Sequence, residues 1–345
     1  MWQLAGYELR KICCRKMVYV SLAFLIFMNV MTYWRLGPSS ERCLTAEGEM
    51  LEGVEAIRYM QEFDRRYAGV LTDGRAKEIY ESSYPPEAVD KAGGDFWYVC
   101  PDILQYLDGA FYESGGMGVE SLFTPEMGEI HLGYHRGYSM LLFSMIYIML
   151  VVGCVIVIAI APVYAEEYSR GTDALILTAR YGKTLEVKAK LAASFLFSSL
   201  LCLAVIAVNY ILFFMVYGTE GGDTSVQVDF TKRNWEIPYE IDYMQLAGYC
   251  VLIWLMASLL LTGITLVVSA FCNTSFTAVV FAAACYVVPV WFSLPGWAAV
   301  LMPAYQMLPQ GVLNLGCIRI FGREVMSLWI AAGVGAAVMA VSGIG

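Results

Sequence analysis

Residues 140–161 read MLLFSMIYIMLVVGCVIVIAIA, a stretch without a single charged side chain. About 20 consecutive apolar residues suffice for a helix to cross the hydrocarbon core of a bilayer. The whole chain follows the same trend: 59% of its 345 residues are hydrophobic and 15% are charged. Soluble domains carry about 25% charged residues. The sequence therefore predicts a membrane protein.

Five further apolar runs lie on either side of this stretch, so we expect an all-α polytopic membrane protein with six transmembrane helices. The predicted helices cover residues 17–36, 139–162, 191–217, 246–271, 276–294 and 325–345. The first run could be a secretory signal, but it has nearly full span length and Tyr33-Trp34-Arg35 replaces a small-residue cleavage site. We interpret it as a retained anchor.

Basic residues indicate the orientation of the spans, because short cytoplasmic segments are rich in Lys and Arg. One basic cluster precedes the first span and another lies within residues 163–190, whereas residues 218–245 are mainly acidic. The N-terminus is thus expected in the cytoplasm, and we expect a multi-pass protein of a bacterial plasma membrane. The last predicted span reaches Gly345 without a basic residue after it, which suggests that the natural chain continues.

The segments between the spans have distinct expected roles. Residues 1–16 predict an interfacial helix with Trp2 and Ile12 toward the membrane and Glu8, Lys11 and Arg15 in water. The other segments are an extracytoplasmic, mainly helical domain (37–138), a cytoplasmic region (163–190), an outer loop (218–245) and an outer re-entrant segment (295–323).

The domain at 37–138 is long enough to fold by itself. Apolar periodicity predicts a helix over Leu51–Tyr67 capped by Gly69, and a second helix over 71–84 ends before Pro85-Pro86. The aromatic-rich residues 95–112 are expected to pack on both helices. This domain could only shape the surface, or it could gate a substrate or bind a partner. Whether Cys43 and Cys100 pair is left open.

Catalytic and metal-binding patterns are not evident, and we expect no enzyme, cofactor or metal. Gly182-Lys183-Thr184 resembles the end of a phosphate-binding loop, but Leu177 stands where that loop requires its first glycine. His131 and His135 would share one face of a helix and could bind a metal. Gly133 weakens such a helix and no third ligand follows. ATP hydrolysis is therefore expected in a separate subunit.

The charged stretch from Glu166 to Lys190 predicts two short helices separated by a break at Tyr181-Gly182. Gly171 interrupts the first of them, and its apolar centre lies at 174–177. An apolar patch with a charged rim is typical of a partner surface. The alternative is a plain cytoplasmic loop whose charges only set the topology.

This stretch resembles the permease subunits of type-2 ABC export systems, which also carry a glutamate, a Gly-Thr pair, a leucine-rich run and a basic end. The YELRKI start and the turn TLVVSAFCNTSFTAVV (265–280) are similar to that family, whereas Ala179 stands where a serine is frequent. The residues expected to couple to an ATPase are Glu166, Glu167, Gly171, Thr172, Leu175, Ile176, Leu177, Arg180, Lys183 and Lys190.

The resemblance implies an ATP-driven exporter whose partners are an ABC ATPase (nucleotide-binding) subunit and a second permease subunit, in a homo- or heterodimer, with membrane lipids around them and no nucleic acid. An unidentified apolar or amphipathic substrate would move outward, because no span carries a charge apart from its ends. The alternative is a membrane-anchored sensor or assembly protein whose outer domain binds a ligand.

Overall fold

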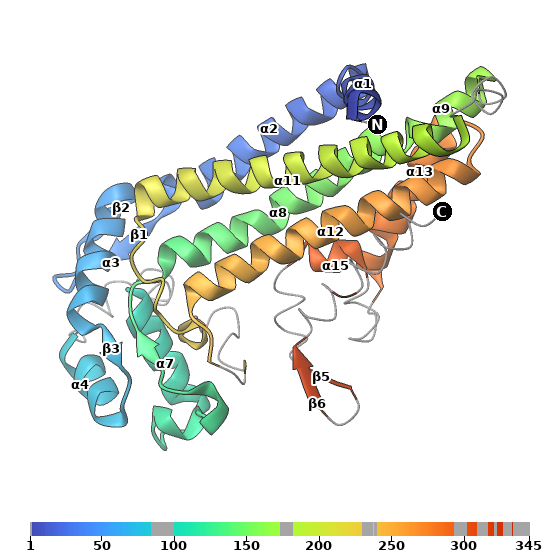
Figure 1. The fold of residues 1–345 in the computed structure, drawn as a ribbon. Helices are drawn as coiled ribbons and strands as arrows, with labels where there is room; N and C mark the ends of the chain where they lie inside the picture. Colours follow the sequence, from blue (N-terminus) through green and yellow to red (C-terminus); the bar gives the residue numbers. More distant parts are fainter. Residues whose placement is uncertain are drawn as a thin grey trace. The chain divides into compact units, whose positions relative to one another are not determined.

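The computed structural model describes residues 2–83, 100–172, 182–229, 237, 240–292, 302–308, 317–320, 323–326 and 333 (Figure 1). Within these residues the chain is mainly helical and carries three small two-stranded sheets. It divides into two compact units. Unit 1 consists of Met1–Val30, Met145–Val208 and Cys250–Gly345, and unit 2 consists of Met31–Ser144 and Asn209–Tyr249.

In the described part of the chain, four helices are long and apolar enough to cross a membrane. They are α2 (Lys16–Leu36), α8 (Arg136–Ile160), α11 (Val187–Tyr217) and α12 (Tyr243–Phe271). The shortest has 21 residues, which corresponds to about 32 Å at 1.5 Å per residue. A hydrocarbon core of about 30 Å needs that length. The apolar runs at 17–36, 139–162, 191–217 and 246–271 thus form the expected long helices.

The fifth predicted helix is shorter than expected. α13 (Ser275–Val287) has 13 residues and begins with the Thr274 side chain accepting a hydrogen bond from the backbone N–H of Thr277. A short 3₁₀ turn, η9 (Val288–Trp291), follows it. Pro289 has no backbone N–H to continue the α-helical hydrogen-bond pattern, so the α-helix ends at Val287 and a 3₁₀ turn follows. Residues 293 and 294 lie outside the described part of the chain.

The sixth predicted helix does not begin at Val325. Strand β6 (Arg323–Met326) includes that residue and pairs antiparallel with β5 (Cys317–Ile320). Apart from residue 333, the rest of 327–345 lies outside the described residues. The expected re-entrant segment at 295–323 is described only in part, where α15 (Pro303–Gln306) forms a single turn.

Polar contacts join the helices of unit 1. Thr262 Oγ1 on α12 donates to Ser198 Oγ on α11 at 2.6 Å. Tyr286 on α13 donates from its hydroxyl to the carbonyl oxygen of Leu150 on α8 at 3.2 Å. Hydrogen bonds of this kind hold helices together in a membrane, because lipid tails are as apolar as the helix surfaces and no hydrophobic driving force joins the helices.

Unit 2 contains the mainly helical domain that the sequence predicts. Its helices are α3 (Gly53–Tyr67), α4 (Asp73–Ser83) and α7 (Asp102–Glu113). The first begins two residues later than expected because Leu51 and Glu52 belong to strand β2 (Met50–Glu52), which pairs with β1 (Arg42–Leu44). Apolar side chains from α4 and α7, among them Ile79, Ile103 and Leu107, form the core.

Two expectations for unit 2 turn out differently in the structure. Gly69 has φ +131° and belongs to strand β3 (Gly69–Val70), which pairs with β4 (His131–Leu132), so it is not a left-handed helix cap. Cys43 and Cys100 are buried free thiols. Burial raises the pKa of both thiols above the ordinary value, which keeps them protonated and unreactive.

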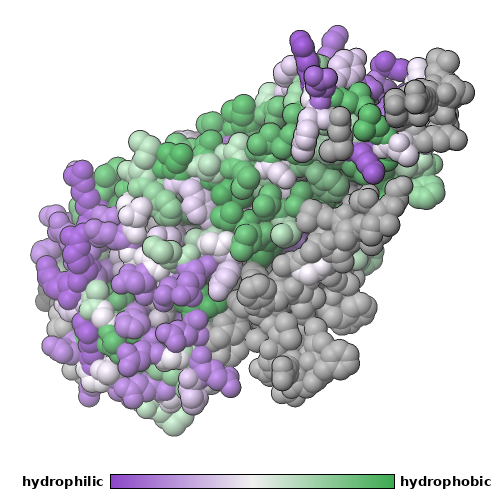
Figure 2. All heavy atoms as spheres, viewed as in Figure 1, coloured by the Kyte–Doolittle hydropathy of each residue, from purple (hydrophilic) through white to green (hydrophobic). Residues whose placement is uncertain are grey.

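Hydrophobic side chains gather over the long helices, whereas hydrophilic side chains gather over the helices of unit 2 (Figure 2). On α2 alone, Phe24, Ile26 and Phe27 are each more than half exposed. Large exposed apolar surfaces are rare on soluble proteins but are required of helices that face lipid. The chain therefore has the properties of a membrane protein.

Candidate functional site

A network of ion pairs in unit 1 joins three segments that are far apart in the sequence. They are α1 (Trp2–Cys13), α9 (Pro162–Arg170) and the start of α11, which follows a π-helical turn over Gly182–Glu186. This network includes part of the charged stretch that the sequence singles out for coupling. We therefore treat it as the candidate site.

The N-terminal helix α1 is amphipathic, as expected for a helix at a membrane interface. Ala5 and Ile12 are buried, and so is Glu8, which the sequence places in water. Glu8 is buried because its carboxylate has a partner: Lys11 Nζ lies 3.9 Å from Glu8 Oε2. The same Lys11 Nζ lies 3.4 Å from Glu167 Oε1 on α9. A buried acid with a nearby base costs far less than an unpaired one.

The short helix α9 has specific contacts at both ends. Proline is favoured in the first turn, where Pro162 begins the helix. The hydroxyl oxygen of Ser269 on α12 accepts hydrogen bonds from the backbone N–H groups of Tyr164 and Ala165, at 3.0 and 3.2 Å. Gly171 ends the helix in the left-handed conformation at φ 64°. The interruption that the sequence predicts at Gly171 is thus confirmed, whereas Tyr181 of the predicted break lies outside the described residues.

Arg15, in the link between α1 and α2, connects α8 and α9. Its Nη1 donates to the carbonyl oxygen of Ala159 at 2.9 Å, and its Nη2 donates to Glu166 Oε2 at 2.9 Å. The last carbonyl groups of a helix lack partners within the helix and attract cations. Arg15 thus satisfies the C-terminal end of α8 and holds the first acid of α9 at the same time.

Lys190 connects α11 with α9. Its side chain is 2% exposed and forms an ion pair with Glu167, and Nζ also donates to Glu186 Oε1 at 2.7 Å. The ring of Tyr164 lies 5.7 Å from the same ammonium group, within the range of a cation–π interaction. Because Glu167 also contacts Lys11, this one carboxylate joins α9 to both α1 and α11.

The charges of the network balance among the residues that the structure describes. Four acidic and four basic side chains take part, namely Glu8, Glu166, Glu167, Glu186, Lys11, Arg15, Arg170 and Lys190. Partly buried ion pairs need such balance and complete hydrogen bonding to be stable. A displacement of α9 would separate several of these pairs at once, so the network favours movement of its three segments together.

The structure brings together some, and not all, of the residues predicted for coupling. Glu166, Glu167 and Lys190 belong to the network, and Gly171 and Thr172 form the end of α9, where the Thr172 N–H donates to Glu167 O at 3.1 Å. Leu175, Ile176, Leu177 and Arg180 lie outside the described residues. Lys183 is described only in its backbone, at the turn before α11. Since Lys190 is buried, its contribution is to hold Glu167 and Glu186, and it offers no surface to a partner.

Sequence reasoning missed several residues of this site. It places Glu8, Lys11 and Arg15 in water, and its coupling residues do not include Tyr164, Arg170, Glu186 and Ser269. The available signal was a cluster of opposite charges near expected membrane boundaries: Arg15 at the start of one span and Glu166 at the end of another. Nothing in the sequence indicates that these two boundaries meet.

Other sequence candidates do not combine into a second site of the predicted kind. Thr184 belongs to the π-helical turn that leads into α11. His131 lies in strand β4 and His135 precedes α8, so the two do not share a helix face. Among the described residues, no group of three or more His, Cys, Asp or Glu could hold a metal ion.

Comparison with protein-family models, with curated proteins and with solved structures finds no match for this chain. The function is therefore argued from the geometry and the sequence pattern.

Proposed function

We propose that the chain is the transmembrane permease subunit of an ATP-driven ABC exporter, powered by a separate ATPase subunit. One observation carries the proposal. A short helix, α9, directly follows a membrane-length helix, and its Glu167 is ion-paired with both Lys11 of α1 and Lys190 of α11. A partner that displaces this short helix would act on two further helices through a single carboxylate.

The proposed mechanism uses α9 and the residues after it as the contact for the ATPase. ATP binding and hydrolysis would move the partner, and the network would pass that movement to α1 and α11. The partner has to contact the inward-open and outward-open states differently, because a ligand with equal affinity for both states shifts nothing. The charge of Arg170, which is exposed at the end of α9, suits such contacts.

Direction, substrate and assembly are parts of the same proposal. The distribution of basic residues supports a cytoplasmic N-terminus in a bacterial plasma membrane. The apolar surfaces of the long helices are compatible with an apolar or amphipathic substrate moving outward. A second permease subunit would complete the route, either as a copy of this chain or as a related one.

The experiment compares two lysines that lie two residues apart on α11. Lys190 is buried in the network, whereas Lys188 is exposed. The tagged full-length chain is purified from its own host, and any co-purifying ATPase is tested for ATP hydrolysis in lipid vesicles. We expect Lys190→Met to reduce ATP hydrolysis by the complex severalfold and Lys188→Met to leave it unchanged.

Two results would overturn the proposal. In the first, the chain alone hydrolyses ATP. In the second, no ATPase polypeptide accompanies the chain under mild solubilisation, which would favour the membrane-anchored sensor or assembly protein. Binding of an ATPase with equal activity in both lysine variants would keep the partner but reject the role of the network.

A further inference from the structure

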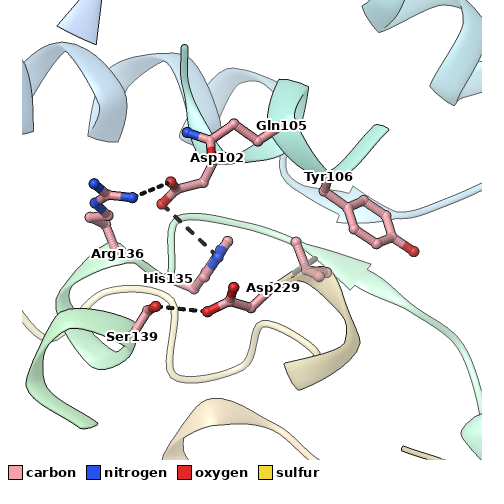
Figure 3. Close-up of a pocket in the computed structure, with 8 residues that line it drawn as sticks. Asp102, Gln105, Tyr106, His135, Arg136, Ser139 and Asp229 are labelled. Atoms are coloured by element: carbon pink, nitrogen blue, oxygen red, sulfur yellow. Dashed lines mark hydrogen bonds and ion pairs between the residues drawn. The ribbon is translucent and has the colours of Figure 1, made fainter. Parts of the chain in front are cut away.

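A small cavity in unit 2 lies at the N-terminal end of α8 (Figure 3). Its volume is about 10 Å³, which is close to the space that one water molecule requires. The cavity is lined by Asp102 from α7, His135 just before α8, Ser139 from the first turn of α8, and Asp229 from the segment after η6 (Val226–Val228). All of these groups belong to unit 2, so the site is complete within it.

Most charged groups around the cavity have fixed partners. Arg136 donates from Nη1 to Asp102 Oδ1 at 3.2 Å, and its Nη2 lies 3.0 Å from Glu41 Oε2. Asp229 Oδ2 accepts hydrogen bonds from the hydroxyls of Ser139 and Tyr243, at 2.7 and 3.1 Å. Asp102 Oδ2 is different, because this buried atom has no hydrogen-bond partner among the described residues.

His135 faces that oxygen. The side chain is 4% exposed, and its ring stacks on Tyr243 with 5.2 Å between ring centroids. Nδ1 lies 3.3 Å from the carbonyl oxygen of Gly133. Because a carbonyl oxygen can only accept, Nδ1 is the nitrogen that carries the single hydrogen when the ring is neutral. Nε2 of that ring is then an acceptor, and it lies 4.0 Å from Asp102 Oδ2.

In that neutral form Nε2 and Oδ2 are both acceptors, so they cannot form a hydrogen bond with each other. Among the described residues, Glu41 and Asp102 carry two formal negative charges and share the positive charge of Arg136. Buried charge without compensation is costly. A proton on Nε2 would turn the contact into a donor–acceptor pair and would reduce the excess charge by one.

We propose that His135 and Asp102 form a proton-binding site: protonation of His135 creates an Nε2–H donor to Asp102 Oδ2 and ties the start of α7 to the start of α8. The other titratable and charged groups around His135 are Tyr106 from α7, Tyr134 and Arg136 beside it, Asp229 and Tyr243. Asp64 of α3 and Glu41 act on it only through Asp102 and Arg136. The N-terminal end of the α8 dipole opposes a cation there by a smaller amount. Unit 2 is then tighter in acid than at neutral pH, whether or not the chain is a permease.

The chain contains only two histidines, which makes a direct test possible. The full-length chain is labelled with ¹⁵N-histidine, reconstituted in lipid nanodiscs and followed by NMR from about pH 8 to about pH 5, the range in which histidine titrates. We expect a slowly exchanging Nε2–H signal of His135 to arise at low pH. Asp102→Asn should abolish that signal, whereas His131→Gln should retain it.

Hydrogen exchange supplies a second measurement that does not depend on the NMR assignment. Protection of backbone amides at 102–107 and 135–139, corrected for intrinsic exchange rates, should rise about tenfold on acidification, as expected for one charge-assisted hydrogen bond. His135→Gln should lose the change and His131→Gln should keep it. A His135 ring that stays neutral down to pH 5, or equal protection changes in both histidine variants, would overturn the proposal.

Discussion

Arg15 and Glu166 lie 151 positions apart in the sequence, yet Arg15 Nη2 donates to Glu166 Oε2 at 2.9 Å. Both side chains are partly buried, at 16% and 22% exposure. This pair links the segment before α2 to the helix after α8, and it fixes the position of the charged stretch on which the proposed function depends.

A double-mutant cycle measures this link. Arg15→Gln and Glu166→Gln should each destabilise the folded chain, and the double variant should lose less than the sum. The expected coupling energy is about 1 kcal/mol or more, as for residues in direct contact. Unfolding of the full-length chain in mixed micelles gives the values. Arg10→Gln is the control, because Arg10 is exposed on α1; strictly additive effects would contradict the pair.

Because α8 and α13 are in tight contact, one added methyl group between them should lower the stability of the folded chain. A Cβ atom on Gly153 would overlap the end of the Tyr286 side chain, whereas a Cβ atom on Gly248 in α12 would meet nothing within 4 Å. Gly153→Ala should therefore destabilise the chain by about 1 to 3 kcal/mol through overpacking. Gly248→Ala should be neutral or slightly stabilising. Equal stability of the two variants in thermal unfolding would reject the contact.

Truncating a side chain of α7 that lies in the core of unit 2 should destabilise the folded chain strongly. Leu107 is fully buried, whereas Tyr112 on the same helix is 82% exposed. Leu107→Ala should cost about 2 to 5 kcal/mol, the usual cost of truncating a buried leucine. Tyr112→Ala should cost less than about 0.5 kcal/mol. Limited proteolysis within residues 53–113 measures the stability of this region, and similar cleavage rates for both variants would argue against the packing.

The buried carboxyl group of Asp64 should make the stability of the folded chain depend on pH. This residue of α3 is fully buried, and burial raises the pKa of its carboxyl well above the ordinary value, with a further increase from the charge of Asp102. Above about pH 4 the unfolded chain releases this proton while the folded chain retains it. Protection of α3 from hydrogen exchange should therefore fall as the pH rises toward the folded-state pKa.

The isosteric variant Asp64→Asn carries no titratable proton and should remove this dependence, with higher stability than the natural chain at neutral pH. Glu55→Gln, at an exposed position of the same helix, should leave it in place. The loss of stability begins near the pKa of an ordinary aspartate and continues toward the folded-state pKa, so comparison of Asp64→Asn with His135→Gln is what separates it from the effect of His135. A pH profile of Asp64→Asn identical to that of the natural chain would show that the carboxyl is ionised when folded.

Local patterns were sufficient to predict most of the helices. The four long helices follow from apolar runs, because the length of a run alone decides whether a helix can cross a hydrocarbon core. α3 follows from apolar periodicity: Ile57 and Phe63 of the predicted face are buried, although Val54 of that face is exposed. The end of α9 follows from Gly171, since glycine adopts the left-handed conformation at little cost. The helix over 276–294 was predicted too long, although Pro289 was visible in it.

The sequence by itself determined that this is a chain of membrane-length helices with a folded polar region, because hydropathy and helix punctuation are properties of neighbouring residues. Only the tertiary structure decided which charges are partners: Lys11 and Lys190 with Glu167, Arg15 with Glu166, and His135 facing Asp102. These contacts join residues from separate helices, and a sequence records which groups are charged but not which of them packing brings within a few ångströms.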